Sequence, residues 1–139
     1  MTAEEMWKLS GLTGEYEAWS YGVAANKLAD LTNRGIKTAT ASAYVLYEID
    51  EEELPKENSY SVILDEDDNA ICIIKTTKVY VVPFNQVSED HAYKEGEGDR
   101  SLNYWRKVHK EFFTPQMEEA GLSFTEDMLV VCEEFEKVF

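Results

Sequence analysis

Cysteine and histidine are scarce in this chain of 139 residues, and their scarcity excludes several kinds of site. The two cysteines, Cys72 and Cys132, lie 60 residues apart within apolar runs, and no Cys-x-x-Cys motif is present. Neither a zinc site nor a redox pair is therefore predicted, and both thiols are expected to be small buried hydrophobic groups in a reducing compartment. The two histidines, His91 and His109, are too few for a multi-histidine metal site. We accordingly expect no metal and no cofactor.

Positively charged residues are also few. The chain has 13 Lys and Arg against 28 Asp and Glu, a formal net charge of −15. Such a field repels polyanions at long range, so no binding to DNA is expected. It still allows an uncharged nucleoside as a ligand, or a local basic groove that acts at short range. One segment is locally basic, with Arg100, Arg106, Lys107 and Lys110 against Asp99.

No hydrophobic run approaches the roughly 20 residues that a membrane span needs. The first residues, Met1–Trp7, are acidic and lack an apolar core, so no signal peptide is predicted. We expect a cytoplasmic protein without a membrane partner. The 44% hydrophobic content and three tryptophans are enough to form one core, and the length suits a single domain over residues 1–139.

The hydrophobic pattern predicts helices and strands that do not alternate. The expected helices are 23–34, 44–53, 88–94 with Ser88 as its cap, and one from Leu102 that breaks and restarts at Thr114-Pro115 and stops at Gly121. The expected strands are 37–41, a hairpin of 60–64 and 70–84 around the turn 65–69, and a closing strand 128–139. This order favours an α+β domain around a curled antiparallel sheet, because a parallel sheet needs alternating elements.

Common catalytic signatures are missing, which leaves two segments with unusual local chemistry. No phosphate loop, dinucleotide-binding glycine motif, His-Glu-x-x-His or Gly-x-Ser-x-Gly occurs. In the first segment, Gly35–Ser42, Lys37 and Thr40 can meet if the chain turns between them. Burial would then lower the pKa of the lysine, whose amine could take a proton from the threonine hydroxyl. The alternative is a solvated lysine beside ordinary strand-forming threonines.

The second segment is the acidic, glycine-interrupted loop that contains Glu95 and Glu97. A carboxylate here is expected to act as a general acid or base beside Lys37, or to hold its ammonium in place; the alternative is a solvated loop between helices. The nearby histidines are interpreted as structural polar residues. Trp19 and Tyr21 could form a wall on which a base stacks, although aromatic residues more often pack in a core.

Taken in chain order, these segments resemble the ASCH domain family. The resemblance is carried by Ala18-Trp19-Ser20-Tyr21-Gly22, then Gly35-x-Lys37-Thr38-Ala39-Thr40-Ala41-Ser42, then Glu95-Gly96-Glu97-Gly98-Asp99, followed by Trp105, His109 and Phe112-Phe113. It spans nearly the whole chain and is closest to bacterial members of about this length. It implies a PUA-like fold, a small β-barrel with surrounding helices and a cleft lined by the Gly-x-Lys-Thr segment.

The resemblance also implies candidate activities. Some members of the family are amidohydrolases that remove the acetyl group of 4-acetylcytidine, others are described as ribonucleases, and the family has been proposed to bind RNA. The amidohydrolase set of lysine, threonine and glutamate falls on Lys37, Thr40 and Glu95, with Glu97 as a competitor of Glu95. The chain departs from those members at Ser42, where they carry arginine, and in an insertion at 44–57.

We therefore predict an amidohydrolase that acts on an acylated cytidine-type nucleoside, with Thr40 as nucleophile, Lys37 as its base and Glu95 in support. The alternatives are a non-catalytic module that binds RNA or a modified nucleotide, and a ribonuclease. In the binding alternative, phosphate contacts would come from Arg34, Lys37, Arg100 and Arg106. The predicted substrate-binding residues are Trp19, Tyr21, Thr38, Ser42, Glu97, Arg100 and Arg106.

Overall fold

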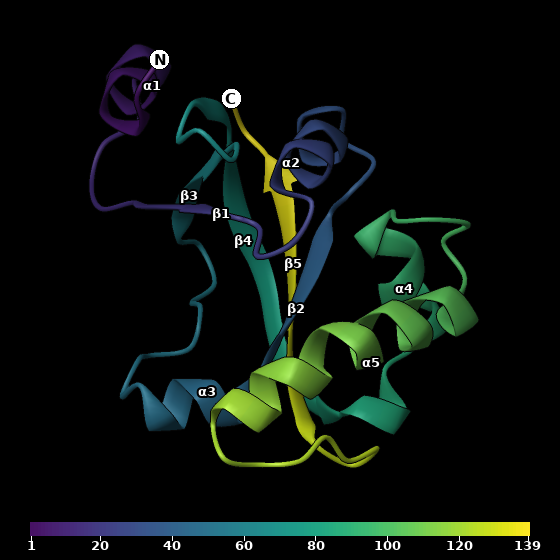
Figure 1. Ribbon diagram of the computed structural model, residues 1–139. Coiled ribbons are helices and arrows are strands. Elements are labelled where there is room, and N and C mark those ends of the chain that lie inside the picture. The colour runs from purple at the N-terminus through teal and green to yellow at the C-terminus, as the bar shows by residue number, and fades with distance from the viewer.

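A curled five-stranded sheet forms the centre of the computed structural model, which describes residues 1–139. The strand order across the sheet is β1-β3-β4-β5-β2 (Figure 1). The strands are β1 (Glu17–Ser20), β2 (Ala39–Ala43), β3 (Tyr60–Leu64), β4 (Ala70–Pro83) and β5 (Leu129–Lys137). The long strands β4 and β5 run the length of the molecule and connect its two halves.

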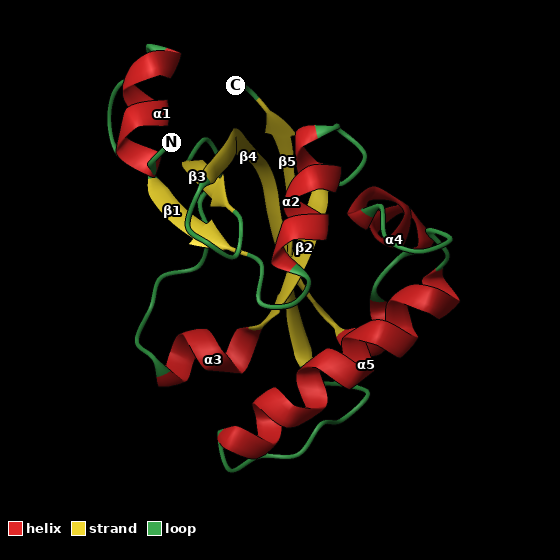
Figure 2. Ribbon diagram, turned by 45° about the horizontal axis from the view of Figure 1, so that its top comes forward, coloured by secondary structure: helices red, strands yellow, loops and turns green.

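Helices surround this sheet. Figure 2 shows α2 across one end of the sheet, α4 and α5 together beside it, α3 near the opposite end, and α1 packed beyond β1 and β3. The fold is the predicted α+β, PUA-like class. No helix is both long enough and apolar enough to cross a membrane. The helices are α1 (Ala3–Ser10), α2 (Ala25–Asn33), α3 (Tyr44–Ile49), a 3₁₀ turn (Phe84–Gln86), α4 (Glu89–Glu95) and α5 (Leu102–Glu119).

The predicted hairpin is confirmed as the antiparallel pair β3–β4. Its turn is held by the carboxylate of Asp65, which accepts hydrogen bonds from the backbone N–H groups of Asp67 and Asn69 at 2.9 Å. Pro83 is the last residue of β4, as expected for a residue that cannot donate to a ladder. Ser88 caps α4 through the N–H of His91, also as predicted.

One strand and one helix were not predicted, and one strand pair runs in an unexpected direction. The four-residue β1 pairs with β3 in parallel, so the sheet is mixed rather than wholly antiparallel. The strand is too short for alternation along the chain to reveal it, and its pairing depends on where β3 lies in space. The missed helix, α1, begins with a capping box between Thr2 and Glu5.

The predicted break in the last helix is wrong. Helix α5 continues through Pro115 to Glu119, with Pro115 on its exposed side. There the ring removes the backbone hydrogen bond that residue 115 would donate to the carbonyl of Glu111, and the hydroxyl of Thr114 donates to the neighbouring carbonyl of Lys110 at 2.6 Å. The buried stripe of α5 runs along one face of the helix. It consists of Trp105, His109, Phe113 and Met117.

Three hydrophobic clusters fill the space between the sheet and its helices. The largest lies against α5 and contains Phe84, Trp105 and Cys132. A second lies under α2 and contains Leu28 and Cys72, while a third forms around Trp7 of α1. Both cysteines are therefore buried in the core as small hydrophobic groups, as predicted.

Candidate functional site

The site begins with the short segment between α2 and β2, which carries Lys37. The backbone N–H groups of Ile36 and Lys37 both donate to the carbonyl of Leu31 in α2. The N–H of Thr38 donates to the carbonyl of Lys94 in α4 at 2.7 Å. The segment is thus tied to two helices, and the side chain of Lys37 runs into the interior, where it is only 1% exposed.

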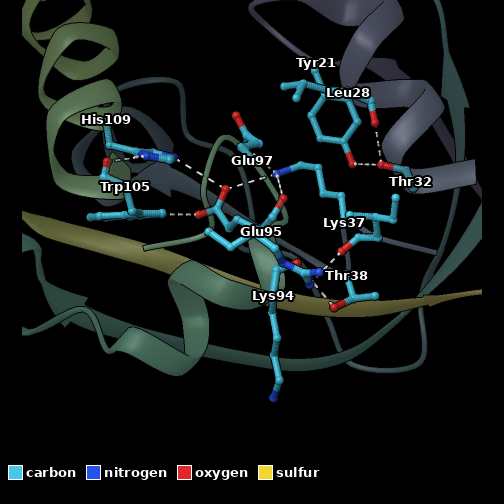
Figure 3. A network of polar contacts seen from close by, with 12 residues as sticks. Tyr21, Leu28, Thr32, Lys37, Thr38, Lys94, Glu95, Glu97, Trp105 and His109 are labelled. Carbon is cyan, nitrogen blue, oxygen red and sulfur yellow. Dashed lines mark hydrogen bonds and ion pairs between the residues drawn. The ribbon is translucent and has the colours of Figure 1, made fainter. Parts of the chain in front are cut away.

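Every N–H of the Lys37 ammonium has a partner in the protein (Figure 3). Its Nζ donates to Glu97 Oε2 at 2.8 Å, to Glu95 Oε1 at 3.1 Å and to the carbonyl oxygen of Glu95 at 3.4 Å. The same Nζ lies 5.3 Å from the centre of the Tyr21 ring. Because an ammonium has three donors, Lys37 has none left for a ligand in this arrangement.

Glu95 lies at the centre of the network. Its Oε2 accepts from His91 Nε2 at 2.7 Å and from Trp105 Nε1 at 2.5 Å. Its Oε1 lies 3.1 Å from Lys37 Nζ and 3.5 Å from His109 Nε2. The other ring nitrogen of His109, Nδ1, lies 2.9 Å from the carbonyl oxygen of Trp105. Both nitrogens of His109 therefore face oxygen atoms of the protein.

The charges in this cluster stabilise one another. Burial opposes ionisation of Glu95, but Lys37 and His109 outweigh it and hold the pKa of this carboxyl well below its usual range. Burial alone would lower the pKa of Lys37, but Glu95 and Glu97 raise it above its ordinary value. The prediction that burial would lower the pKa of Lys37 is therefore wrong, because two carboxylates share its pocket. Lys37 is a cation in this structure.

Thr40 belongs to β2, the strand that follows the Lys37 segment. No hydrogen bond joins its hydroxyl to Lys37, Glu95 or Glu97. In β2 it stands directly across from Glu133 of β5. Ala41 and Ala43 of the same strand pack in the cluster against α5, so strand alternation turns Thr40 to the opposite face.

The two predicted aromatic residues lie at one edge of the network. The rings of Trp19 and Tyr21 meet edge to face with centroids 5.1 Å apart. Tyr21 is buried, and its hydroxyl lies 2.8 Å from Oγ1 of Thr32. Burial, the largest effect, raises the pKa of Tyr21. Its ring contributes to the pocket of the Lys37 ammonium and to the core under α2.

The remaining predicted substrate-binding residues make contacts within the protein. The hydroxyl of Thr38 donates to the carbonyl of Lys94, and that of Ser42 lies 2.8 Å from the hydroxyl of Tyr47. The guanidinium of Arg100 covers the ring of Tyr93 at 3.7 Å and donates to the backbone of the same residue. Arg106 reaches the carbonyl of Asn85 at 3.5 Å.

A groove of about 600 Å³ leads to this cluster from the surface, between the start of α2 and one side of α5. Glu97 lines the groove while its carboxylate holds Lys37. The walls are partly apolar, and the charged lining is mainly acidic, since only one lysine faces three glutamates. The groove is lined by Gly22, Val23, Ala24, Lys27, Leu28, Glu97, Tyr104, Val108, Glu111, Phe112, Pro115, Gln116 and Glu119.

The glycines of the acidic loop allow close packing at the mouth of the site. Gly96 and Gly98 both have positive φ, 72° and 57°. A Cβ on Gly96 would lie 2.6 Å from the carbonyl oxygen of Ile36, and one on Gly98 would clash with the ring of Tyr104. The loop can therefore carry Glu97 over Lys37 only if both positions lack a side chain.

Sequence reasoning missed the roles of His91, Trp105 and His109 in this cluster. The signal was present in their spacing: His91 and Glu95 lie four residues apart in α4, and Trp105 and His109 lie four residues apart in α5. Side chains with this spacing share a helix face. No group of three or more His, Cys, Asp or Glu side chains is placed to hold a metal ion.

Comparisons with known proteins agree with the family resemblance of the sequence. The profile described as the ASCH domain matches residues 17–139. A crystal structure of an ASCH domain from Lactobacillus crispatus JV V101 is 37% identical in sequence, with a TM-score of 0.89 over 97% of this chain and 91% of that one. A protein from Enterococcus faecalis V583, described by the family name DUF984, is 36% identical, with a TM-score of 0.82 over 96% of this chain and 83% of that one. No curated protein matches the chain.

Proposed function

Since the chain belongs to the ASCH domain family, a PUA-like fold compatible with RNA binding, we propose that it binds an uncharged, acylated cytidine-type nucleoside in the groove and hydrolyses its acyl amide. The observation that carries the proposal is that Glu97 faces both the groove and Lys37. Its side chain lines the groove and is 20% exposed, yet its carboxylate holds the buried ammonium of Lys37 at 2.8 Å. A ligand that engages Glu97 releases one N–H of Lys37.

The released N–H of Lys37 would act on the amide carbonyl. A fixed ammonium in a pocket closed to water stabilises the negative charge that develops on this oxygen in the transition state. Glu95 would hold Lys37 in position, because it is itself fixed by His91, Trp105 and His109. Glu97, the exposed carboxylate of the pair, would take a proton from the nucleophile and pass it to the leaving amine of the base.

Two groups are candidates for the nucleophile. The family resemblance assigns this role to Thr40, which would have to reach the ligand from the other face of β2. A water molecule activated by Glu97 needs no such movement. We favour water, because Lys37 is held as a cation by two carboxylates and would be a poor base for Thr40.

The charge of the groove favours an uncharged ligand. Its lining carries Glu97, Glu111 and Glu119 against Lys27 alone. A phosphate group placed there would meet like charges in a partly enclosed space, where repulsion is weakly screened. A nucleoside can instead place its sugar and base along the apolar wall of Val108 and Phe112 and direct an N–H toward Glu97.

The test is ultraviolet-monitored hydrolysis of 4-acetylcytidine and longer acyl cytidines, with products identified by mass spectrometry. We expect turnover by the wild-type protein and a loss of at least 100-fold in kcat/KM for Lys37→Met and Glu97→Gln, in line with the contribution of electrostatic and acid–base groups. Lys107→Ala, which removes an exposed positive charge from α5, is the matched control and should keep full activity.

Thr40→Val separates the two nucleophiles, because it removes only the hydroxyl. Retained turnover would support water, and turnover abolished in a folded Thr40→Val protein would establish threonine. If the wild-type protein hydrolyses none of the acyl cytidines, or if Lys37→Met remains fully active, the proposal is wrong.

RNA binding is the second candidate, supported by the fold and by the exposed basic residues Arg106 and Lys107 of α5. The other basic residues predicted to contact phosphate are less available. Lys37 is buried, and Arg34 pairs with Asp30 at 3.4 Å. Arg100 is engaged by Tyr93. Titration of RNA at several salt concentrations tests this candidate, because phosphate binding must weaken steeply as salt increases.

A further inference from the structure

The groove continues along α5 beyond the residues to which the proposed function gives a role. One row of its lining follows a single face of the helix, because its members are spaced four residues apart. Tyr104 marks the end near Glu97, since a Cβ on Gly98, the next residue, would clash with its ring. Gln116 marks the other end, so the row begins with an aromatic ring and ends with a carboxamide. The row consists of Tyr104, Val108, Phe112 and Gln116.

Gln116 has a side-chain acceptor without a donor. Its Oε1 is buried and has no hydrogen-bond partner in the protein; the only other buried side-chain atom in this state is Nδ1 of His91. His91 belongs to the Glu95 network and does not line the groove, whereas Gln116 does. The torsion that orients a glutamine amide is broad, so this oxygen can turn toward a ligand in the groove. Because an unpaired buried acceptor costs free energy, a ligand that donates to it gains an interaction that the protein alone leaves unmade.

A short chain of contacts connects the Lys37 site to Gln116. The Nζ of Lys37 lies 5.3 Å from the centre of the Tyr21 ring. The next residue, Gly22, lies against Phe112, since a Cβ on Gly22 would be 3.4 Å from that ring. Gln116 follows Phe112 by four residues, a rise of about 6 Å along the helix. A nucleoside whose exocyclic amine faces the Lys37 site and whose base lies along Phe112 therefore directs its sugar toward Gln116.

We infer that Gln116 determines specificity for the sugar of the nucleoside, because its Oε1 accepts a hydrogen bond from a sugar hydroxyl. This inference rests on the nucleoside binding of the proposed function and adds the residue that distinguishes a nucleoside from a free base. A site built to hydrogen-bond a hydroxyl discriminates strongly against an analogue that lacks it, since the polar group of the protein is then left unpaired. Gln116 lies away from the reacting amide, so it acts on binding rather than on the chemical step.

The residues beside this row favour a free hydroxyl over a phosphate as the partner of Gln116. Glu111 and Glu119 also line the groove, on a neighbouring row of α5. A phosphate on the sugar would meet both carboxylates at short range. A hydroxyl supplies the donor that the amide oxygen lacks and adds no charge. The end of the groove is therefore suited to a free nucleoside.

Calorimetric titration tests the inference with cytidine, the product of the proposed reaction, and with its 2′-, 3′- and 5′-deoxy analogues, each of which lacks one hydroxyl. We expect one analogue to bind more weakly than cytidine, by about fivefold or more. Gln116→Leu, which keeps the approximate volume but removes the amide, should weaken cytidine binding to the same extent and leave the binding of that analogue nearly unchanged. Gln86→Leu removes an amide from an exposed position and should affect none of the four ligands.

Equal weakening of all four ligands by Gln116→Leu would overturn the inference, because the substitution would then act through the shape of the groove. Unchanged cytidine binding by Gln116→Leu, or no cytidine binding by the wild-type protein, would overturn it too. Gln116→Met, which is unbranched like glutamine, gives the same test if Gln116→Leu does not fold. Hydrolysis of 4-acetylcytidine is measured separately. Turnover with the same KM in wild type and Gln116→Leu would support the proposed function and refute this inference, whereas cytidine binding that depends on Gln116 without any turnover would do the reverse.

Discussion

At the scale of single residues, the most consequential group is Glu95. Two helices and the α2–β2 segment bring four side chains to its carboxylate: Lys37, His91, Trp105 and His109. A buried charge is stable only while its partners remain. The loss of any partner therefore leaves an uncompensated group in the interior, and the effect on stability exceeds the value of one hydrogen bond.

Glu95→Gln tests this role through the pH dependence of stability. The folded-state pKa of Glu95 lies below its ordinary value of 4.5, so its contribution is present above about pH 4.5 and is lost as pH falls through the folded value. We expect the variant to lose about 3 to 5 kcal/mol at pH 7, because the buried ammonium of Lys37 then keeps only Glu97 as a charged partner. Its urea-unfolding free energy should then fall less steeply than the wild type below pH 4.5. Glu111→Gln on the surface of α5 should leave both quantities unchanged.

At the scale of elements, α5 combines two functions. Its buried stripe supplies Trp105 and His109 to the Glu95 network and Phe113 to the core. Its other side supplies Val108 and Phe112 to the groove. Pro115 interrupts the hydrogen bonds of the helix on the groove side, at the point where the last turn begins. The helix is continuous because its packing compensates the lost bond.

Pro115→Ala should stabilise this element. The alanine N–H can donate to the carbonyl of Glu111, and the ring no longer clashes with the preceding turn. We expect the free energy of unfolding to rise by about 1 to 3 kcal/mol. Urea denaturation measures the change, and Glu118→Ala on the exposed side of the same helix is the control, with an expected effect below about 0.5 kcal/mol. A destabilised Pro115→Ala protein would mean that the ring itself packs against the groove.

At the scale of the whole molecule, the net charge of −15 acts against the compact state. Like charges repel one another at distances that a protein of this size spans, and salt screens the repulsion. The strongest ion pairs, around Lys37, are buried and are screened much less. Added salt should therefore relieve the repulsion without weakening the central network.

Thermal unfolding at pH 7 measures this balance. The melting temperature should rise by several degrees between 10 mM and 150 mM NaCl, since the Debye length falls from about 30 Å to about 8 Å over this range. KCl should give the same rise, because screening depends on ionic strength rather than on the ion. A melting temperature that falls with salt would show that exposed ion pairs stabilise this protein more than its net charge destabilises it.

The class of fold, most element boundaries and the two segments that form the site follow from patterns along the chain. The local signals are the hydrophobic period, the Asp65–Asn69 turn, Pro83 and the Ser88 cap. Such signals can be recognised without knowledge of tertiary contacts, because they depend on residues close in sequence. Tertiary structure decided the rest. It pairs β1 in parallel with β3, keeps α5 whole through Pro115, and gives Lys37 two carboxylate partners. It also gives the buried Glu95 a cation, Lys37, because the charge state of a buried group depends on residues distant in sequence that the fold brings to it.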